Sequence, residues 1–303
     1  MPSSTPASGS EANRLSVRTG AAPRYEELRR AYRLWRRSPL SIVGTALVGL
    51  ILGVAMLAPW IAPYDPLAQD FSVRLQPPGR AHWFGTDQFG RDIFSRVVFG
   101  SRIALEIILI VSVISGGVGA LVGWVAGYFG GRVDEVLMRL TDMFLAFPSL
   151  ILAMAFAAAL GPSLPNMIFA ISLVTWTPYA RLARGETLRI KAHDFVEAAR
   201  AMGASDLRII FRHVLPMTLS VLIVQLTLRM GAIVLTAAGL GFLGLGAQPP
   251  TPEWGAMVSD GRNYIVDQWW MPTLPGSAIA AGVLGFNLLG DGIRDMLDPR
   301  LRR

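Results

Sequence analysis

The chain has 303 residues, of which 52% are hydrophobic and 16% are charged, and its mean hydropathy is +0.44. Because a soluble domain carries about 25% charged residues, this composition predicts a membrane protein. Cysteine is absent, which excludes a disulfide framework and any thiolate metal site or nucleophile. The three histidines are far apart, and the net charge of +7 falls between long uncharged runs, so neither a histidine metal centre nor a nucleic-acid-binding face is supported.

The first segment, to about residue 24, is rich in Ser, Ala and Pro, and we expect it to be disordered. The stretch RYEELRRAYRLWRRSPL follows, with Tyr, Leu and Trp among its basic residues. Such a pattern is typical of an amphipathic helix lying on the inner leaflet of a membrane. We therefore interpret residues 1–38 as a cytoplasmic tail.

Four long runs contain no Asp, Glu, Lys or Arg, and a membrane-spanning helix needs about 20 apolar residues. These runs are 38–64, 107–131, 143–180 and 268–290. The third is long enough for two helices, and its GPSLPN motif is a turn signal that predicts a hairpin between them. One more span is expected between Pro216 and Glu253, so the sequence predicts an all-helical membrane protein with six transmembrane helices.

The distribution of Lys and Arg among the loops predicts the orientation of the spans. Alternate loops carry most of these residues on one side, which places both termini in the cytoplasm. We divide the chain into the tail, a first transmembrane helix with an external loop at 39–100, and a core at 101–303. The core contains five transmembrane helices and a cytoplasmic segment at 181–216.

Gly119, Gly123 and Gly127 repeat every four residues in the second span, a spacing that lets helices approach closely in lipid. The spacing fits packing within this chain or a contact with a second membrane subunit. No lysine follows these glycines in the phosphate-loop pattern, and G-x-x-x-x-G-K-[ST] occurs nowhere in the chain. ATP hydrolysis by that route is therefore excluded.

Two polar segments are expected on the external side. GTDQFGRD at 85–92 offers Asp87 and Asp92, but two aspartates are too few for a metal site, and we interpret the segment as an external surface helix. AQPPTPEWGAMVSDG at 247–261 begins with Pro and Gly residues suited to an irregular external loop.

The segment EAARAMGASDLRIIFRHVLP, residues 197–216, is charged and amphipathic although it lies between two apolar spans. It predicts two short helices, with Gly203 as a left-handed stop and Ser205 as the N-cap of the second, followed by Asp206 in its first turn. Pro216 then starts or kinks the next span. The segment is either a solvated connector with its arginines on lipid headgroups or a protrusion that docks into a soluble partner.

The residues Glu197-Ala198-Ala199, Gly203 and Leu215-Pro216 resemble the EAA loop of ABC-importer permeases. HWFGTDQFGRDIFSRVVFGSRIAL, FLGLGAQPPTPEWGAMVSDGRNYI and FNLLGDGIRDMLDPRLR, in this order, resemble the dipeptide, oligopeptide and nickel importer group. The resemblance covers most of the chain and is to the second permease subunit, an inner membrane component of binding-protein-dependent transport.

This resemblance implies a type I ABC importer transmembrane domain in a bacterial plasma (inner) membrane, and a transport subunit rather than an enzyme. It implies a complex with a different permease, one or two kinds of ATPase and an extracytoplasmic solute-binding protein. ATP and Mg²⁺ would be bound by the ATPases, while this chain would hold no cofactor, metal or catalytic residue. The ATPase-coupling residues would be Glu197, Ala198, Ala199, Gly203, Leu215 and Pro216.

The cargo that the resemblance implies is a di- or oligopeptide, with nickel, glutathione and oligosaccharides as alternatives. Arg229 lies in the middle of the fifth span, with Gln225 one turn before it on the same face. An arginine at that depth costs from about 2.5 kcal/mol upward. It either pairs with a neighbouring helix or lines a wet cavity, or it faces the translocation path and meets a peptide carboxylate.

Two functions of other classes remain as alternatives. A membrane-embedded enzyme would need polar groups that converge inside the spans, and the sequence offers only Arg229, Glu106 at an edge, Asn287 and scattered hydroxyls. A secondary transporter would differ in that its uptake requires neither ATP nor a binding protein.

Overall fold

The structure, a computed structural model, describes Trp35 and residues 38–297, and every regular element among them is a helix. The predicted disordered start and most of the basic amphipathic stretch lie outside these residues. The helices are α2 (Pro39–Met56), α3 (Ala58–Ile61), η1 (Phe71–Val73), α4 (Ile93–Phe129), α5 (Gly131–Leu145), α6 (Ser149–Leu160), α7 (Leu164–Thr175), α8 (Thr177–Lys191), α9 (Asp194–Ala201), α10 (Asp206–Ile209), the π-helical turn η2 (Ile210–Val214), α11 (Leu215–Phe242), α12 (Trp254–Gly261), η3 (Arg262–Tyr264) and α13 (Trp270–Leu297).

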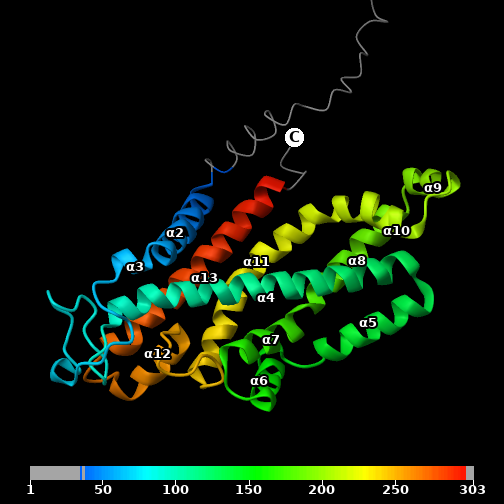
Figure 1. Cartoon of the computed structure of the whole chain (residues 1–303). Coiled ribbons are helices and arrows are strands. Elements are labelled where there is room, and N and C mark those ends of the chain that lie inside the picture. The colour runs from blue at the N-terminus through cyan, green and yellow to red at the C-terminus, as the bar shows by residue number, and fades with distance from the viewer. Residues whose placement is uncertain (1–34, 36–37, 298–303) are drawn as a thin grey trace, which may run out of the picture.

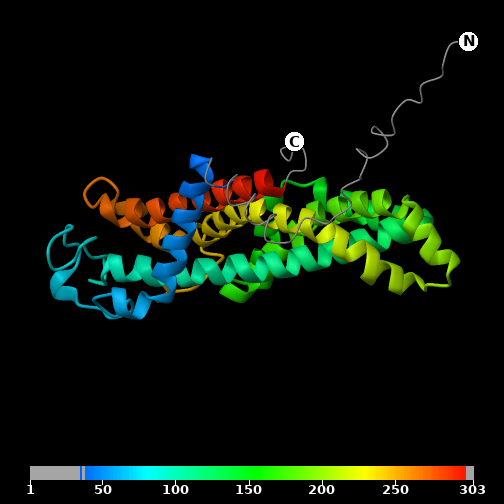
Figure 2. The same ribbon diagram turned by 90° about the horizontal axis from the view of Figure 1, so that it is seen from above.

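The longest axis of the molecule is marked by α4, whose 37 residues span about 55 Å at 1.5 Å per residue. The hydrocarbon core of a bilayer is only about 30 Å thick, so α4 extends beyond it. Figure 1 shows α4 running from the loop at residues 62–92 toward the end that carries α9, and Figure 2 shows the same elongated outline from above. The loop and α9 therefore lie at opposite ends of the molecule.

Three pairs of helices form the frame: α4 packs against α8, α11 against α13, and α13 against α2. The amphipathic helix α5 lies beside α8 and is held there by ion pairs from Arg184 to Asp134 and from Arg181 to Asp142. The frame thus brings the two ends of the described chain, α2 and α13, together on one side of α11.

The apolar core follows the long axis as three buried clusters. One fills the middle of the molecule around Val111 of α4 and Ile171 of α7. A second surrounds Trp124 of α4 and Ile190 of α8 near the α9 end, and a third surrounds Trp254 of α12 at the opposite end. Each cluster includes at least one side chain of α4 or lies against it, so α4 connects the three.

The glycine repeat of α4 is filled by α8 of the same chain. A Cβ added at Gly119 would lie 2.6 Å from the Tyr179 Cβ, and one at Gly123 would lie 2.6 Å from the Ala183 Cβ. Gly127 faces Thr187 in the same way, at 2.8 Å. The prediction of close internal packing is confirmed, and the alternative, a contact of this face with a second subunit, is wrong.

The all-helical prediction is confirmed, whereas the count of six spans stays a prediction. Among the described residues, four helical segments are long and apolar enough to cross a membrane: 39–56, 93–129, 206–242 and 270–296. A fifth span results if α5 and α6, which meet at an 89° bend, are counted together. The predicted hairpin is present, but it joins α6 and α7 of 12 residues each, or about 18 Å, which is shorter than a bilayer core.

Replacing Gly123 with Ala should lower the stability of the protein by about 1–3 kcal/mol, because the new methyl group would overlap Ala183 and the backbone of α8. The matched control is Gly117→Ala, since no atom lies within 4 Å of a Cβ built there. That substitution should be neutral or stabilise α4 by up to about 1 kcal/mol. Thermal unfolding of both variants in detergent measures the difference, and equal midpoints would contradict the tight α4–α8 contact.

Candidate functional site

Residues 194–214 form a compact projection that we call the α9–η2 segment, at the end of the molecule opposite the 62–92 loop (Figure 1). The predicted pair of short helices is confirmed: α9 is followed by a turn and then by α10. The second helix does not end, because α10, η2 and α11 continue as one helical path to Phe242. A movement of the projection is therefore connected directly to a candidate membrane span.

The turn after α9 is a Schellman motif centred on Gly203, whose φ is +81°. The Gly203 N–H donates to the Arg200 carbonyl at 3.0 Å, and the Ala204 N–H donates to the Ala199 carbonyl at 3.1 Å. These are the two bonds that satisfy the last carbonyls of a helix when a left-handed residue follows it. The predicted left-handed stop is confirmed, and a side chain at this position would be strained.

The second predicted cap is only partly present. Ser205 occupies the N-cap position of α10, but its side chain makes no capping hydrogen bond. Asp206 in the first turn instead accepts a hydrogen bond from the Tyr128 hydroxyl at 2.6 Å. The backbone of Ser205 has the extended conformation expected of an N-cap residue, but its hydroxyl accepts no hydrogen bond from the first turn of α10. The predicted side-chain cap is therefore absent.

The EAA residues divide between the two faces of α9. Ala199 is buried, whereas Glu197 and Ala198 are exposed. The Glu197 carboxylate makes no hydrogen bond within the part of the chain that the structure describes. The negative charge of Glu197 in the first turn of α9 interacts favourably with the helix dipole.

Leu215 and Pro216 lie at the beginning of α11, directly after the π-helical turn. The Leu215 N–H donates to the Ile210 carbonyl, as a π-helical turn requires, and Pro216 has no N–H to donate. The prediction that Pro216 starts the span is confirmed for α11, with the correction that helical structure also precedes it.

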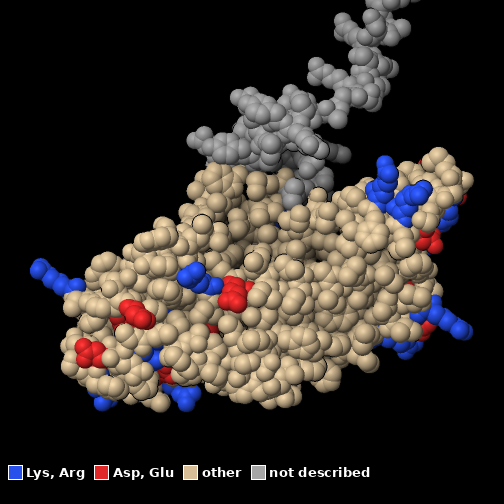
Figure 3. Space-filling view, in the orientation of Figure 1, with Lys and Arg blue, Asp and Glu red and all other residues tan. Residues whose placement is uncertain are grey.

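An exposed apolar surface covers the outer side of the projection. Its large side chains are Phe195, Met202, Leu207 and Phe211, of which Met202 is 82% and Leu207 is 64% exposed. The exposed Arg200, Arg208 and Arg212 accompany them, and Figure 3 shows basic side chains gathered at this end. Exposed apolar side chains surrounded by polar ones are typical of a surface that contacts another protein or a membrane. The sequence motif did not indicate Met202 or Leu207, because it concerns only Glu, Ala, Gly, Leu and Pro.

Tyr128, near the end of α4, is a second residue that the sequence analysis missed. Its side chain is buried, its hydroxyl bonds to Asp206 and lies 3.4 Å from Nη2 of Arg200, and its carbonyl accepts from Nζ of Lys191 at 2.6 Å. Arg200 and Asp206 are 72 and 78 residues away along the chain. No local sequence signal connects positions so far apart.

Arg229 is half-buried in the middle of α11, and Gln225 lies half-buried one turn before it. Neither side chain has an ion pair or hydrogen bond to any residue between 38 and 297. Leu226 packs on Gly116 of α4, and because α4 and α11 run in opposite directions, Arg229 lies about level with Ser112. The interpretation of Arg229 as one half of an internal ion pair therefore finds no partner in the described chain.

Two other polar groups accompany Arg229 in the interior. The Ser112 hydroxyl is buried and has no hydrogen-bond partner in the described chain, whereas the buried Tyr179 hydroxyl interacts with Ser115. The charge of Arg229 interacts electrostatically with Tyr179. Buried polar groups usually have partners. Ser112 and Tyr179 thus place polar groups near Arg229 between α4, α8 and α11.

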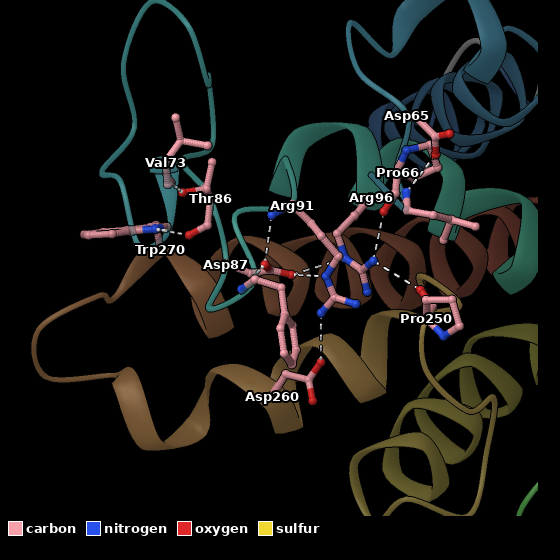
Figure 4. A network of polar contacts seen from close by, with 12 residues as sticks. Asp65, Pro66, Val73, Thr86, Asp87, Arg91, Arg96, Pro250, Asp260 and Trp270 are labelled. Carbon is pink, nitrogen blue, oxygen red and sulfur yellow. Dashed lines mark hydrogen bonds and ion pairs between the residues drawn. The ribbon is translucent and has the colours of Figure 1, made fainter. Parts of the chain in front are cut away.

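The opposite end of the molecule is held by the buried ionic network in Figure 4. Nε of Arg91 lies 2.5 Å from Oδ2 of Asp87, and the same guanidinium lies 3.6 Å from Asp260 of α12. Arg96 of α4 contacts Asp87 at 3.8 Å and donates to the carbonyls of Pro66 and Pro250 at 2.9 and 3.2 Å. The network thus joins the 62–92 loop, α4, α12 and the loop before α12.

The prediction of an external surface helix at 85–92 is wrong. The segment forms turns and one isolated bridge, and its Asp87, Arg91 and Asp92 are buried. Asp92 caps α4 by accepting from the Ser95 N–H at 2.7 Å and also contacts His82 at 2.9 Å. The polar pattern was misleading because these charges neutralise one another instead of facing solvent. Both aspartates are thereby engaged, and the described residues contain no cluster of three metal-ligating side chains.

Glu253 is buried where the loop after α11 enters α12. Its carboxylate accepts from the N–H groups of Gly255 and Ala256 at 2.8 and 2.7 Å and so caps α12. Burial raises the pKa of Glu253 from 4.5 to about 6, and the two backbone hydrogen bonds act in the opposite direction. The carboxyl group therefore changes its charge near pH 6.

Comparisons with known proteins agree with one another. Residues 119–303 match the family described as "Binding-protein-dependent transport system inner membrane component", and residues 27–78 match "N-terminal TM domain of oligopeptide transport permease C". The "Probable D,D-dipeptide transport system permease protein DdpC" of Escherichia coli (strain K12) is 50% identical over 87% of this chain and 88% of its own length. The "Dipeptide transport system permease protein DppC" of Alkalihalophilus pseudofirmus is 44% identical over 90% of both chains.

Two further similarities broaden the picture. The "Glutathione transport system permease protein GsiD" of Escherichia coli O6:K15:H31 is 44% identical over 89% of this chain and 90% of its own length. A solved structure entitled "Inward facing conformations of the MetNI methionine ABC transporter" superposes with a TM-score of 0.55 at 20% identity, covering 68% of this chain and 98% of that one. At 20% identity, the similarity to the methionine transporter structure concerns the fold alone.

Glu253 should make the stability of the protein depend on pH. Because its pKa is higher in the folded state than in the unfolded state, its contribution is fully present below pH 4.5 and is lost as the pH rises through 6. The loss amounts to about 2 kcal/mol. Glu253→Gln removes this titration, so unfolding midpoints in detergent should fall less between pH 4.5 and 7.5 for the variant than for the wild type. Parallel changes in the two proteins would contradict the raised pKa.

Proposed function

The chain belongs to the family of inner membrane components of binding-protein-dependent transport systems, and we propose that its cargo is a di- or oligopeptide. Its fold is that of a type I ABC importer permease, as the sequence resemblance implied. The names of relatives that are 44–50% identical over most of the chain support a peptide cargo. Glutathione is the alternative that one of these relatives supports directly.

We propose the partners that such a permease needs. A different permease subunit completes the pathway across the bacterial inner membrane, and an extracytoplasmic binding protein delivers the peptide. One or two kinds of ATPase subunit bind ATP and Mg²⁺, which agrees with the lack of a phosphate loop in this sequence. This chain itself holds no cofactor in the proposal.

The observation that carries the proposal is the α9–η2 segment. It combines the EAA residues, a rigid Schellman turn at Gly203 and an exposed apolar surface that includes Met202 and Leu207. We propose that α9 docks into a cleft of the ATPase, with the exposed Glu197 at the contact. A surface connector on lipid headgroups, the alternative from the sequence, does not require a rigid turn.

The proposed mechanism is alternating access. When the ATPases close on ATP, α9 moves with them, and the helical path from α10 to α11 transmits the movement to the spans. The spans then open outward and accept the peptide from the binding protein, and hydrolysis resets the cycle. Arg229 and Gln225, which have no partner among the described residues, are the groups that we propose for the translocation path.

The docking of α9 is tested by co-purification. Wild-type protein solubilised from membranes should bring along an ATPase and a second permease. Glu197→Lys should lose the ATPase alone, and Gly203→Asp should abolish uptake without preventing insertion, because an aspartate there is strained at a φ of +81°. The control is Glu135→Lys, which changes an exposed glutamate of α5 whose surface ion pair is worth about 0–1 kcal/mol. An ATPase that remains bound to Glu197→Lys, or is absent from the wild type, contradicts the proposal.

The role of Arg229 is tested with cargo that differs at one group. Arg229→Gln should reduce the uptake of a dipeptide with a free carboxylate about tenfold, corresponding to about 1.4 kcal/mol. The uptake of the same dipeptide with a C-terminal amide should not change. Arg229→Lys, which keeps the positive charge, is the matched control. The affinity of the binding protein for both peptides must be measured separately, so that a change can be assigned to the permease. Equal losses for both peptides would remove Arg229 from carboxylate recognition.

A further inference from the structure

Apart from the backbone hydrogen bonds at its junctions with α8 and α11, the α9–η2 segment has a single polar attachment to the rest of the described chain. Every side-chain hydrogen bond that leaves residues 194–214 ends on the hydroxyl of Tyr128. Asp206 of α10 accepts from this hydroxyl at 2.6 Å, and Nη2 of Arg200 from α9 lies 3.4 Å from it. One hydroxyl therefore contacts both helices of the projection.

Tyr128 is itself fixed to the α4–α8 pair. Its side chain is only 3% exposed, and its neighbour Gly127 packs directly on Thr187 of α8. Its carbonyl accepts from Nζ of Lys191, the last residue of α8, at 2.6 Å, and the same ammonium group lies 5.5 Å from the centre of the Tyr128 ring. The hydroxyl is thus presented by a rigid part of the frame.

The other side-chain contacts between the projection and α4 are apolar. Val196, Ile209, Ile210 and Val214 share a buried cluster with Trp124 and Tyr128. Apolar burial is non-directional, so it holds the projection against the frame without fixing its angle. Hydrogen bonds to charged groups are directional and stronger than those between neutral groups. The bonds at Tyr128 therefore add a directional link from α9 and α10 to α4, besides the helical connection of α10 to α11.

From these contacts we propose that Tyr128 is a positioning residue, the joint through which α9 and α10 move α4 and α8. The inference rests on the proposed function, because the projection must be driven by an ATPase. Since α4 continues to Arg96 and the ionic network at its other end, a displacement at Tyr128 is carried along the whole molecule. The joint would connect ATPase movement to the external end.

Removal of the hydroxyl should not unfold the protein. Asp206 and Arg200 are both exposed, so each can return to water when Tyr128→Phe removes their partner. The aromatic ring, which occupies the buried cluster, is kept in this variant. The substitution consequently separates transmission from folding, which a change to a small residue would not do.

The experiment uses the complete complex in lipid nanodiscs and a cysteine reporter on α4. The chain has no native cysteine, so Arg102→Cys introduces one labelling site on this chain, at an exposed position about 39 Å along α4 from Tyr128. The change in maleimide labelling on addition of ATP and vanadate is measured together with the rate of ATP hydrolysis. This pair of measurements needs no knowledge of the cargo.

Tyr128→Phe should keep the ATPase bound and hydrolysing near the wild-type rate, while the ATP-dependent change in labelling falls at least about threefold. Asp206→Ala should have the same effect, the two changes together should add nothing further, and Asp206→Asn, which retains an acceptor oxygen, should keep most of the response. Thr218→Val is the structural control, because it removes the hydrogen bond from Trp124 to Thr218 in the same region without touching α9 or α10.

Several results would overturn the joint. One is an ATP-dependent change in labelling that is as large in Tyr128→Phe as in the wild type. Another is a loss of this change in Thr218→Val as large as the loss in Tyr128→Phe. The third is the absence of any ATP-dependent change at position 102 in the protein with Tyr128. Co-purification is read first and separates this inference from the proposed function. If the wild type retains no ATPase, both fail, whereas a wild-type complex that responds to ATP equally with and without the hydroxyl overturns the joint alone.

Discussion

The close approach of α4 to α8 is the contact on which the rest of the molecule depends. Without side chains at Gly123 and Gly127, the two helices lie near enough for Thr187 and Ala183 to touch the backbone surface of α4. This contact holds the end of α4 beside the end of α8, where Lys191 reaches the carbonyl of Tyr128. The position of the tyrosine, and with it the contact to α9 and α10, depends on the glycine positions where α4 carries no side chain.

The two ends of the molecule are stabilised in different ways that suit different tasks. At the loop end, Arg91, Arg96 and Asp87 are almost completely buried and bind several segments at once. Removing one member of such a network leaves an unpaired buried charge, so the network resists deformation. At the α9 end, Arg200 and Asp206 are exposed and meet at a single hydroxyl. That end can change its contacts at much lower cost, as a docking element must.

Local features were predictable from the sequence, and features that depend on distant contacts were not. The hydropathy runs, the glycine repeat and the turn at Gly203 each depend on neighbouring residues, and all three are present. The segment at 85–92 was misassigned because nothing local shows that Arg91 will face Asp260. Tyr128 could not be found because its partners are more than 70 residues away. Of the candidate site, the sequence therefore revealed the projection but not what holds it.

The length of α4 explains why charges are paired where they are, and why Arg229 differs from them. A helix of about 55 Å is longer than a hydrocarbon core of about 30 Å is thick, so polar clusters can form where its ends meet water. The network at Arg96 and the contacts of Tyr128 lie near these ends. Arg229 lies instead beside the middle of α4, level with Ser112, where an unpaired charge is expensive. A group that is costly and yet has no partner in the described chain is better explained by contacts that arise only in the assembled transporter than by the stability of this subunit.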